Sequence, residues 1–196
     1  MKKQTNNSLR TIIAITFLSM LLIMASCQQR KEPNRNAAVS QARVKPPKID
    51  IHTAVMTDNI EALKQHIVAG SNINEKDPFG GSSPLISASL FGKTQMAKLL
   101  IEAGADLNFR NNDGSTALHT ASFFCRPQIV KMLLAKRADK TIKNKYGQTA
   151  YESVAGPFAD VKNAYNGLGK MLEPMGLKLD HTYLEKTRPE IAAMLK

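Results

Sequence analysis

The chain contains the same unit twice in succession, and this internal repeat constrains its fold more than any other feature. Ser83-Pro84-Leu85 aligns with Thr116-Ala117-Leu118, 33 positions later, and the register holds through Ala105-Asp106 and Ala138-Asp139. A period of this length is typical of a stacked array, because one small unit cannot bury its apolar face alone. The sequence therefore predicts a solenoid in which neighbouring units share a core.

Two segments of these units resemble the ankyrin repeat. Thr116-Ala117-Leu118-His119 is similar to the T-P-L-H opening of a first helix in that family, and Gly104-Ala105-Asp106-Leu107-Asn108 is similar to its G-A-D-x-N exit. The resemblance implies an all-α solenoid of helix-turn-helix units joined by short β-turn loops. It also implies that partners bind to the loop tips and to the ends of the first helices, which line a concave face.

We predict that the repeat domain covers residues 50–196, with about five units at 50–76, 77–110, 111–143, 144–179 and 180–196. Asp50 is a suitable N-cap for the first helix. Phe158 to Leu172 has the apolar spacing of a long second helix.

The end of the chain repeats a segment of the clear units, since Arg188-Pro189-x-Ile191 echoes Arg126-Pro127-x-Ile129. We expect Asp180 to cap a short helix through Leu184, and Pro189 to lie in the first turn of a last helix, where its missing N–H is harmless. Ile191 and Leu195 should then pack against the helix from Phe158.

Four positions are interpreted as structural from their place in the repeat. Cys125 stands where Gly92 stands one unit earlier, so we interpret it as a small residue of the turn between two helices. Arg137 replaces the glycine of the helix exit and must adopt or avoid a left-handed conformation. His52 and His119 occupy the T-x-x-H position of the ankyrin family, which implies bonds to loop backbone.

The first 26 residues are predicted to be a secretory signal. Lys2, Lys3 and Arg10 precede an apolar run from Ile12 to Met24. A basic head, a short apolar segment and a small-residue exit are typical of such signals. The run falls short of the ~20 residues that a membrane-spanning helix needs.

Met24-Ala25-Ser26-Cys27 resembles a bacterial lipobox, with methionine where leucine is usual. The resemblance implies that Cys27 carries lipid, palmitate included, as the first residue of the mature protein. In lipoproteins of this kind, Gln28 after the cysteine favours sorting onward to the periplasmic face of an outer membrane, where one exists, over retention at an inner membrane. Cleavage without lipid and an uncleaved anchor are the alternatives.

Residues 27–49 are predicted to be a disordered basic tether. The segment carries six basic residues against Glu32 alone, and it lacks hydrophobic periodicity. Such a composition cannot offset the entropy of ordering the chain. The tether either contacts anionic headgroups or serves as a soluble spacer.

No motif indicates an enzyme or a cofactor. Two cysteines exclude a disulfide framework, and no spacing of Cys, His or carboxylates suggests a metal site. A phosphate loop and a serine elbow are both missing from the sequence. The excess of 27 Lys and Arg over 16 Asp and Glu favours acidic partners or anionic surfaces. Nucleic acid is not expected as a partner of an exported lipoprotein.

Candidate partner-binding residues follow from their positions in the repeat. They are the first-helix residues Leu90, Phe91, Phe123 and Phe124, and the loop residues Phe79, Asn112, Asp113, Lys143, Lys145 and Tyr146. Phe91 and Phe124 stand 33 positions apart and should therefore stack as exposed rings on the concave face. Clustered aromatics of this kind are common at interface centres. The alternative is that one residue of each adjacent pair turns into the core, and we expect this for at least one of them.

Seven basic residues between Arg126 and Lys145 are opposed only by Asp139. This run favours an acidic partner, and a merely solvated face is the alternative. We therefore expect a monomeric, lipid-anchored ankyrin module that binds a protein in the bacterial cell envelope, as an inhibitor or immunity partner of an exported enzyme. The alternative is a scaffolding lipoprotein of the envelope.

Overall fold

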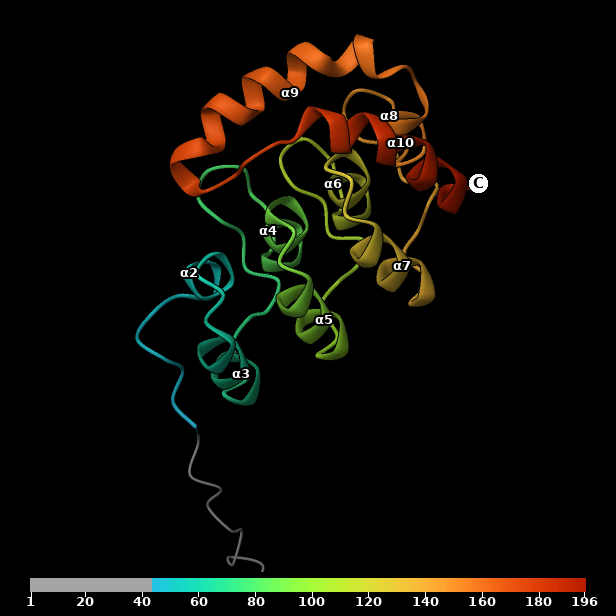
Figure 1. Cartoon of the computed structure of the whole chain (residues 1–196). Helices are drawn as coiled ribbons and strands as arrows, with labels where there is room; N and C mark the ends of the chain where they lie inside the picture. The colour runs from blue at the N-terminus through green and yellow to red at the C-terminus, as the bar shows by residue number, and fades with distance from the viewer. Residues whose placement is uncertain (1–43) are drawn as a thin grey trace, which may run out of the picture. The chain divides into compact units, whose positions relative to one another are not determined.

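The computed structural model describes residues 44–196, which form α-helices, one short 3-10 helix and no strand (Figure 1). The elements are α2 Ile51–Met56, α3 Ile60–Val68, α4 Pro84–Phe91, α5 Thr94–Glu102, α6 Ala117–Phe123, α7 Pro127–Ala135, α8 Glu152–Ala155, α9 Phe158–Leu172, η2 Glu173–Met175 and α10 His181–Leu195. The prediction of an all-α repeat solenoid is confirmed. The predicted signal, Cys27 and most of the predicted tether lie outside the described residues.

Three regular units are formed by the pairs α2–α3, α4–α5 and α6–α7. Each first helix begins at a polar cap whose side chain accepts a hydrogen bond from a backbone N–H three residues later; the caps are Asp50, Ser83 and Thr116. Capping of this kind satisfies a donor that has no partner inside the helix. The first helices pack against one another along the array, and the predicted cap at Asp50 is confirmed.

The turn between the two helices of each unit needs a left-handed residue, which is Asp58, Gly92 or Cys125, with φ of 53°, 68° and 51°. Cys125 therefore has the turn position that the repeat alignment predicts. Arg137 also adopts the left-handed conformation of the helix exit, with φ of 63°.

The fourth unit departs from this pattern after α8. Gly156 is extended, with φ of −76° and ψ of 168°, where the earlier units have a left-handed residue. Pro157 disfavours a helical conformation at the residue before it. The chain consequently leaves the stack, forms α9 and η2, and returns as α10, which packs against α7 and α8.

This arrangement corrects three expectations about the tail. α10 supplies the second helix of the fourth unit, so 180–196 is not a separate fifth unit. Pro189 lies inside one continuous helix instead of in its first turn, because Asp180 caps a helix that has already begun at His181. Ile191 and Leu195 pack in the main core with Ile129 and Leu133 of α7 instead of against α9.

Buried residues form two clusters. The main core runs through all four units, from Ile51 to Leu195. A second cluster consists of Cys125, Tyr165 and Leu184, with Phe123, Phe158, Val161 and Leu179 packed against it. Residues 157–187, which leave and rejoin the stack, are called the insertion lobe below.

The array is covered at its start by residues that the sequence assigned to the tether. The Lys45 carbonyl accepts a hydrogen bond from Gln65, and the Ile49 carbonyl accepts one from His66, both at 2.9 Å. His66 is consequently buried, with 6% of its surface exposed. The ordered domain therefore includes contacts to the last residues before Asp50.

Candidate partner-binding surface

Three loop tips repeat the same turn. The side chains of Asp77, Asn111 and Asn144 each accept a hydrogen bond from the backbone N–H two residues later, at 2.8, 3.0 and 3.0 Å. Such side-chain turns hold a loop in one conformation. The residues that receive this constraint are Phe79, Asp113 and Tyr146, and they occupy equivalent positions in successive units.

Backbone hydrogen bonds join the tips to one another. Asn112 N–H donates to the Gly80 carbonyl at 2.9 Å, and Lys145 N–H donates to the Asp113 carbonyl at 2.8 Å. Arg110 adds a bond from its guanidinium to the Lys143 carbonyl at 2.8 Å. The tips therefore form one connected strip, which we call the tip row; it comprises Phe79, Asn112, Asp113, Lys143, Lys145 and Tyr146.

Two aromatic side chains project from the tip row. Phe79 is 89% exposed and Tyr146 is 67% exposed. Between them, the Asp113 carboxylate pairs with the Lys145 ammonium group, which also lies 5.5 Å from the centre of the Tyr146 ring. The row thus presents an aromatic residue, an ion pair and a second aromatic residue on a backbone that is already ordered.

The Asp77 carboxyl is held ionised at the first tip. Its partial burial acts to raise the pKa, but the N–H groups of Gly80, Phe79 and Ser82 donate to it and the pKa is lowered overall. A carboxylate that accepts several N–H bonds is stabilised in its charged form. The turn that presents Phe79 should therefore persist at neutral pH.

The predicted first-helix residues have a different environment. The Tyr165 ring of α9 stacks on Phe123, with the ring centres 4.5 Å apart and the planes at 27°. Phe124 is only 6% exposed and packs edge-on to Phe123 at 5.2 Å. The prediction that Phe91 and Phe124 form an exposed stack is therefore wrong for Phe124, because the insertion lobe covers this surface, whereas the expectation that at least one residue of these pairs is buried is confirmed.

Leu90 and Phe91 are half-buried at the end of α4. The Leu90 carbonyl accepts a hydrogen bond from the Arg126 guanidinium at 3.1 Å. This bond ties the end of α4 to the turn of the next unit, so Arg126 has a structural role in addition to its charge.

The predicted basic run is dispersed in the structure. Lys140 donates to the Leu195 and Lys196 carbonyls at 3.1 and 3.3 Å, Lys145 pairs with Asp113, and Arg126 is partly buried. Exposed cations in the run include Lys131, Lys136, Arg137 and Lys143. Of the seven basic residues, only Lys143 and Lys145 belong to the tip row, so the positive charge of the tip row is confined to these two side chains.

Both T-x-x-H histidines bond loop backbone, as predicted. His52 Nε2 donates to the Glu75 carbonyl at 3.0 Å, and His119 Nε2 donates to the Gln148 carbonyl at 3.1 Å. Burial lowers the pKa of His119, which favours the neutral imidazole. Within residues 44–196, no group of three or more His, Cys, Asp or Glu side chains could hold a metal ion. No helix in that range is both long and apolar enough to cross a membrane.

Sequence reasoning missed two features of the site. The series Asp77, Asn111 and Asn144 was available as a signal, since Asp or Asn recurs at the repeat period just before each tip. The covering of Phe123 by α9 had no such signal. It depends on where the insertion lobe lies after it leaves the stack.

Comparison with known proteins agrees with this geometry. Residues 51–144 match the model of ankyrin repeats in three copies. Human protein phosphatase 1 regulatory subunit 27 is 35% identical over 81 residues, which is 41% of this chain and 52% of the relative. The human DNA-binding protein RFXANK is 36% identical over 58 residues, which is 30% of this chain and 22% of that protein. The chain thus spans about half the length, or less, of these curated relatives.

A solved structure shows the same architecture. The ankyrin repeat domain of Bcl-3, described as a unique member of the IkappaB protein family, superposes with a TM-score of 0.51 at 33% identity. The match covers 53% of this chain and 45% of that chain. The fold is therefore an all-helical ankyrin-repeat fold, and such repeats are characteristic of protein-protein interaction.

Proposed function

We propose that this chain, whose residues 51–144 are ankyrin repeats, is a lipid-anchored interaction module of the bacterial cell envelope that binds a protein partner along the tip row. The observation that carries the proposal is the strong exposure of Phe79 and Tyr146 on tips that are joined by hydrogen bonds. Folding does not bury these rings. Each can bury ~150–250 Å² against a partner.

The tip row favours a partner with an apolar ridge beside acidic groups. Phe79 and Tyr146 would anchor the ridge, because aromatic side chains carry much of the energy of many interfaces. Lys143 and Lys145 would face the acidic groups. An ordered backbone lowers the entropic cost of association, since the tips need not be fixed on binding.

The partner class that we propose is an exported enzyme, which the chain would inhibit or to which it would confer immunity. Support comes from the absence of catalytic motifs in the sequence and from a relative that is, by its name, a regulatory subunit of an enzyme. Repeat surfaces bind many different proteins on one fold, so the enzyme itself must be identified by capture.

The proposed anchor is Cys27, in Met24-Ala25-Ser26-Cys27. A Cys27→Ala chain should fail to incorporate labelled palmitate and should accumulate as an unprocessed or mis-sorted precursor. Equal incorporation by the Cys27→Ala and parent chains would contradict lipidation at this residue. Fractionation of inner and outer membranes then tests the proposed outer-membrane location.

Affinity capture from the native envelope, followed by mass spectrometry, identifies the partner. A single enzyme whose activity falls when this chain binds supports the inhibitor role, whereas several structural envelope proteins would support a scaffold. With the partner in hand, Phe79→Ala and Tyr146→Ala should each weaken binding about thirty-fold, equivalent to ~2 kcal/mol.

Val68→Ala provides a matched control for these variants. Val68 is also apolar and 69% exposed, but it lies on α3 outside the tip row, so its loss should leave affinity unchanged. Lys143→Glu with Lys145→Glu should slow association and reduce its salt dependence, because charges at an interface edge steer encounter. Parent-like binding by folded Phe79→Ala and Tyr146→Ala chains would exclude the tip row as the site.

A further inference from the structure

The insertion lobe lies on a surface that the repeat otherwise presents to partners. Its helix α9 covers the end of α6 through the contact between Tyr165 and Phe123. Phe123 and its equivalent in the preceding unit, Leu90, are both half-buried, whereas Phe124 is buried and its equivalent Phe91 is only half-buried. A residue of the chain itself, Tyr165, therefore covers the part of the first-helix surface that lies at the end of α6.

A single side chain anchors α9. Tyr165 is the one buried residue among the 15 residues of this helix. Its ring lies between Phe123 and Phe158, with centres 4.5 and 5.7 Å away. Its hydroxyl donates to the Phe123 carbonyl at 2.5 Å and accepts a bond from Arg188 Nη1 at 3.0 Å.

The rest of α9 is weakly held. Gly167 and Gly169 lie inside the helix, where each glycine disfavours the helical state relative to alanine. The N-cap residue of α9, Pro157, makes no side-chain hydrogen bond to the first turn. Among the salt bridges of residues 44–196, none involves α9. Besides the contacts of Tyr165, opening of the lobe requires the loss of the packing of Phe158 and Val161 at the edge of the cluster and of the hydrogen bond from the Tyr183 hydroxyl to the Cys125 carbonyl at 3.2 Å.

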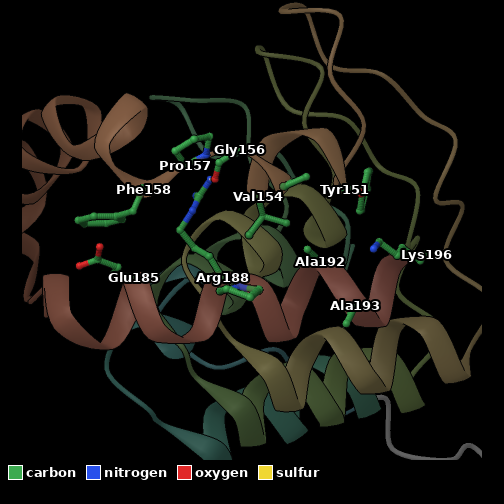
Figure 2. A pocket seen from close by; sticks show the side chains of 12 residues that line it. Tyr151, Val154, Gly156, Pro157, Phe158, Glu185, Arg188, Ala192, Ala193 and Lys196 are labelled. Atoms are coloured by element: carbon green, nitrogen blue, oxygen red, sulfur yellow. The ribbon is translucent and has the colours of Figure 1, made fainter.

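The two ends of the lobe meet at a narrow neck. Figure 2 shows Arg188 reaching from α10 toward Gly156, and its Nη2 donates to the Gly156 carbonyl at 3.2 Å. Pro189 follows directly and has no N–H, so one hydrogen bond of α10 is missing at this point. Gly156 and Pro189 therefore provide a flexible start and a weakened end for the lobe.

The two hydrophobic clusters divide at the same neck. Leu184, before Arg188, belongs to the cluster of the lobe, whereas Ile191, after it, belongs to the main core. A segment with its own small cluster can open locally while the rest of a protein stays folded. The residues of the main core would therefore stay packed when the lobe opens.

We propose that the insertion lobe is a lid over a second partner-binding surface, formed by Phe123 and Phe124 at the end of α6, and that a partner helix with an aromatic anchor displaces it. The chemistry of the occupant is given by Tyr165: a ring that stacks on Phe123 and a hydroxyl that donates to the Phe123 carbonyl. The inference rests on the proposed function and extends it. The partner would contact the tip row first and the surface under the lid second.

Cys125 provides a built-in reporter of lid opening. Its side chain is fully buried in the lobe cluster, and its thiol donates to the Leu184 carbonyl at 3.7 Å. Alkylation of the full-length chain with iodoacetamide, resolved by peptide mass spectrometry, separates Cys125 from Cys27. Tyr165→Ala should accelerate alkylation of Cys125 about a hundredfold or more, since it removes a large buried side chain.

Two further variants make the assay specific. Tyr165→Phe keeps the ring and loses the bond to the Phe123 carbonyl, so it should give an intermediate rate. Met171→Ala changes an exposed residue of the same helix and should leave the rate unchanged. Parent-like alkylation of the Tyr165→Ala chain would overturn the lid.

Amide hydrogen exchange on the same full-length chains separates lid opening from global unfolding. In the Tyr165→Ala chain, exchange should rise in α9 and in the first half of α10, while α5 and α7 keep the rates of the parent. If α7 exchanges faster in parallel with α9, the lobe does not open independently and the proposal is wrong.

A peptide in trans tests the surface under the lid. A fluorescent synthetic peptide of residues 157–176 should bind the Tyr165→Ala chain at least tenfold more tightly than the parent chain, whose own Tyr165 occupies the surface. The same peptide with Tyr165→Ala should not bind. Failure of the parent peptide to bind a chain whose lid is open by exchange would overturn the assigned surface.

These assays do not depend on the native partner. A closed lid with a functional tip row would refute this inference and leave the proposed function intact. An open lid, together with partner binding that is unchanged by Phe79→Ala and Tyr146→Ala, would support this inference and refute the tip row as the binding site.

Discussion

Replacing Arg137 with glycine should stabilise the domain. Arg137 has φ of 63°, at the position where Gly70 and Gly104 end the second helices of the first two units. A left-handed conformation costs a residue with a side chain about 1–2 kcal/mol. Arg137 is exposed, and no hydrogen bond or salt bridge of its guanidinium is found in residues 44–196, so little is lost with the side chain.

The net effect is smaller than the conformational cost. Glycine gains more freedom than arginine in the unfolded chain, which offsets roughly 0.4–1 kcal/mol of the benefit. Arg137→Gly should therefore raise the free energy of unfolding by about 0.5–1 kcal/mol. For a domain of this size, that corresponds to an increase of about 1–4 °C in Tm.

Urea denaturation and thermal melting, both followed by circular dichroism, measure the change. Lys136→Gly is the matched control, since Lys136 is adjacent and exposed but has φ of −94°, outside the left-handed region. This change should not raise the free energy of unfolding. Gly104→Ala is the reciprocal change. A Cβ at Gly104 meets no atom within 4 Å, so its expected loss of about 1 kcal/mol comes from the backbone alone. A lower midpoint for Arg137→Gly, with an unchanged denaturant slope, would refute the reasoning.

Two further predictions concern the main core and the lobe. Ile191→Ala should destabilise the whole domain by ~2–5 kcal/mol in the same denaturation assay, because it removes a fully buried side chain of the main core. Leu184→Ala should chiefly increase amide hydrogen exchange in the lobe. Equal loss of global stability in both variants would contradict the division into two clusters. Burial raises the pKa of the Cys125 thiol from 9.0 to about 11. As the pH rises, the thiol therefore loses its proton in the unfolded chain before it does so in the folded chain. The free energy of unfolding is then unaffected by this group below pH 9 and falls between pH 9 and about 11, by at most about 2–3 kcal/mol. Melting curves across this range should fall more steeply for the parent than for Cys125→Ala, and parallel curves would show that the thiol is not responsible.

Much of the candidate site could be predicted from the sequence, because it lies in the regular units. Position within a 33-residue period placed Phe79 and Tyr146 at loop tips, and both side chains are strongly exposed. The same logic failed for Phe124. Its position at the end of a first helix predicts exposure only if nothing else packs there, and Tyr165 does.

The sequence by itself determined the stacked units and the turn position of Cys125 through the repeat period, the all-helical fold through the ankyrin resemblance, and the caps at Asp50 and Asp180 through residue type. These features depend on contacts between residues close in sequence or one period apart, so their pattern is written along the chain. Only the tertiary structure decided that α10 completes the fourth unit and that α9 covers Phe123. The echo of Arg126-Pro127 at Arg188-Pro189 identified a second helix but not the unit to which it belongs. That choice depends on which buried surface the returning chain meets, and no local periodicity encodes it.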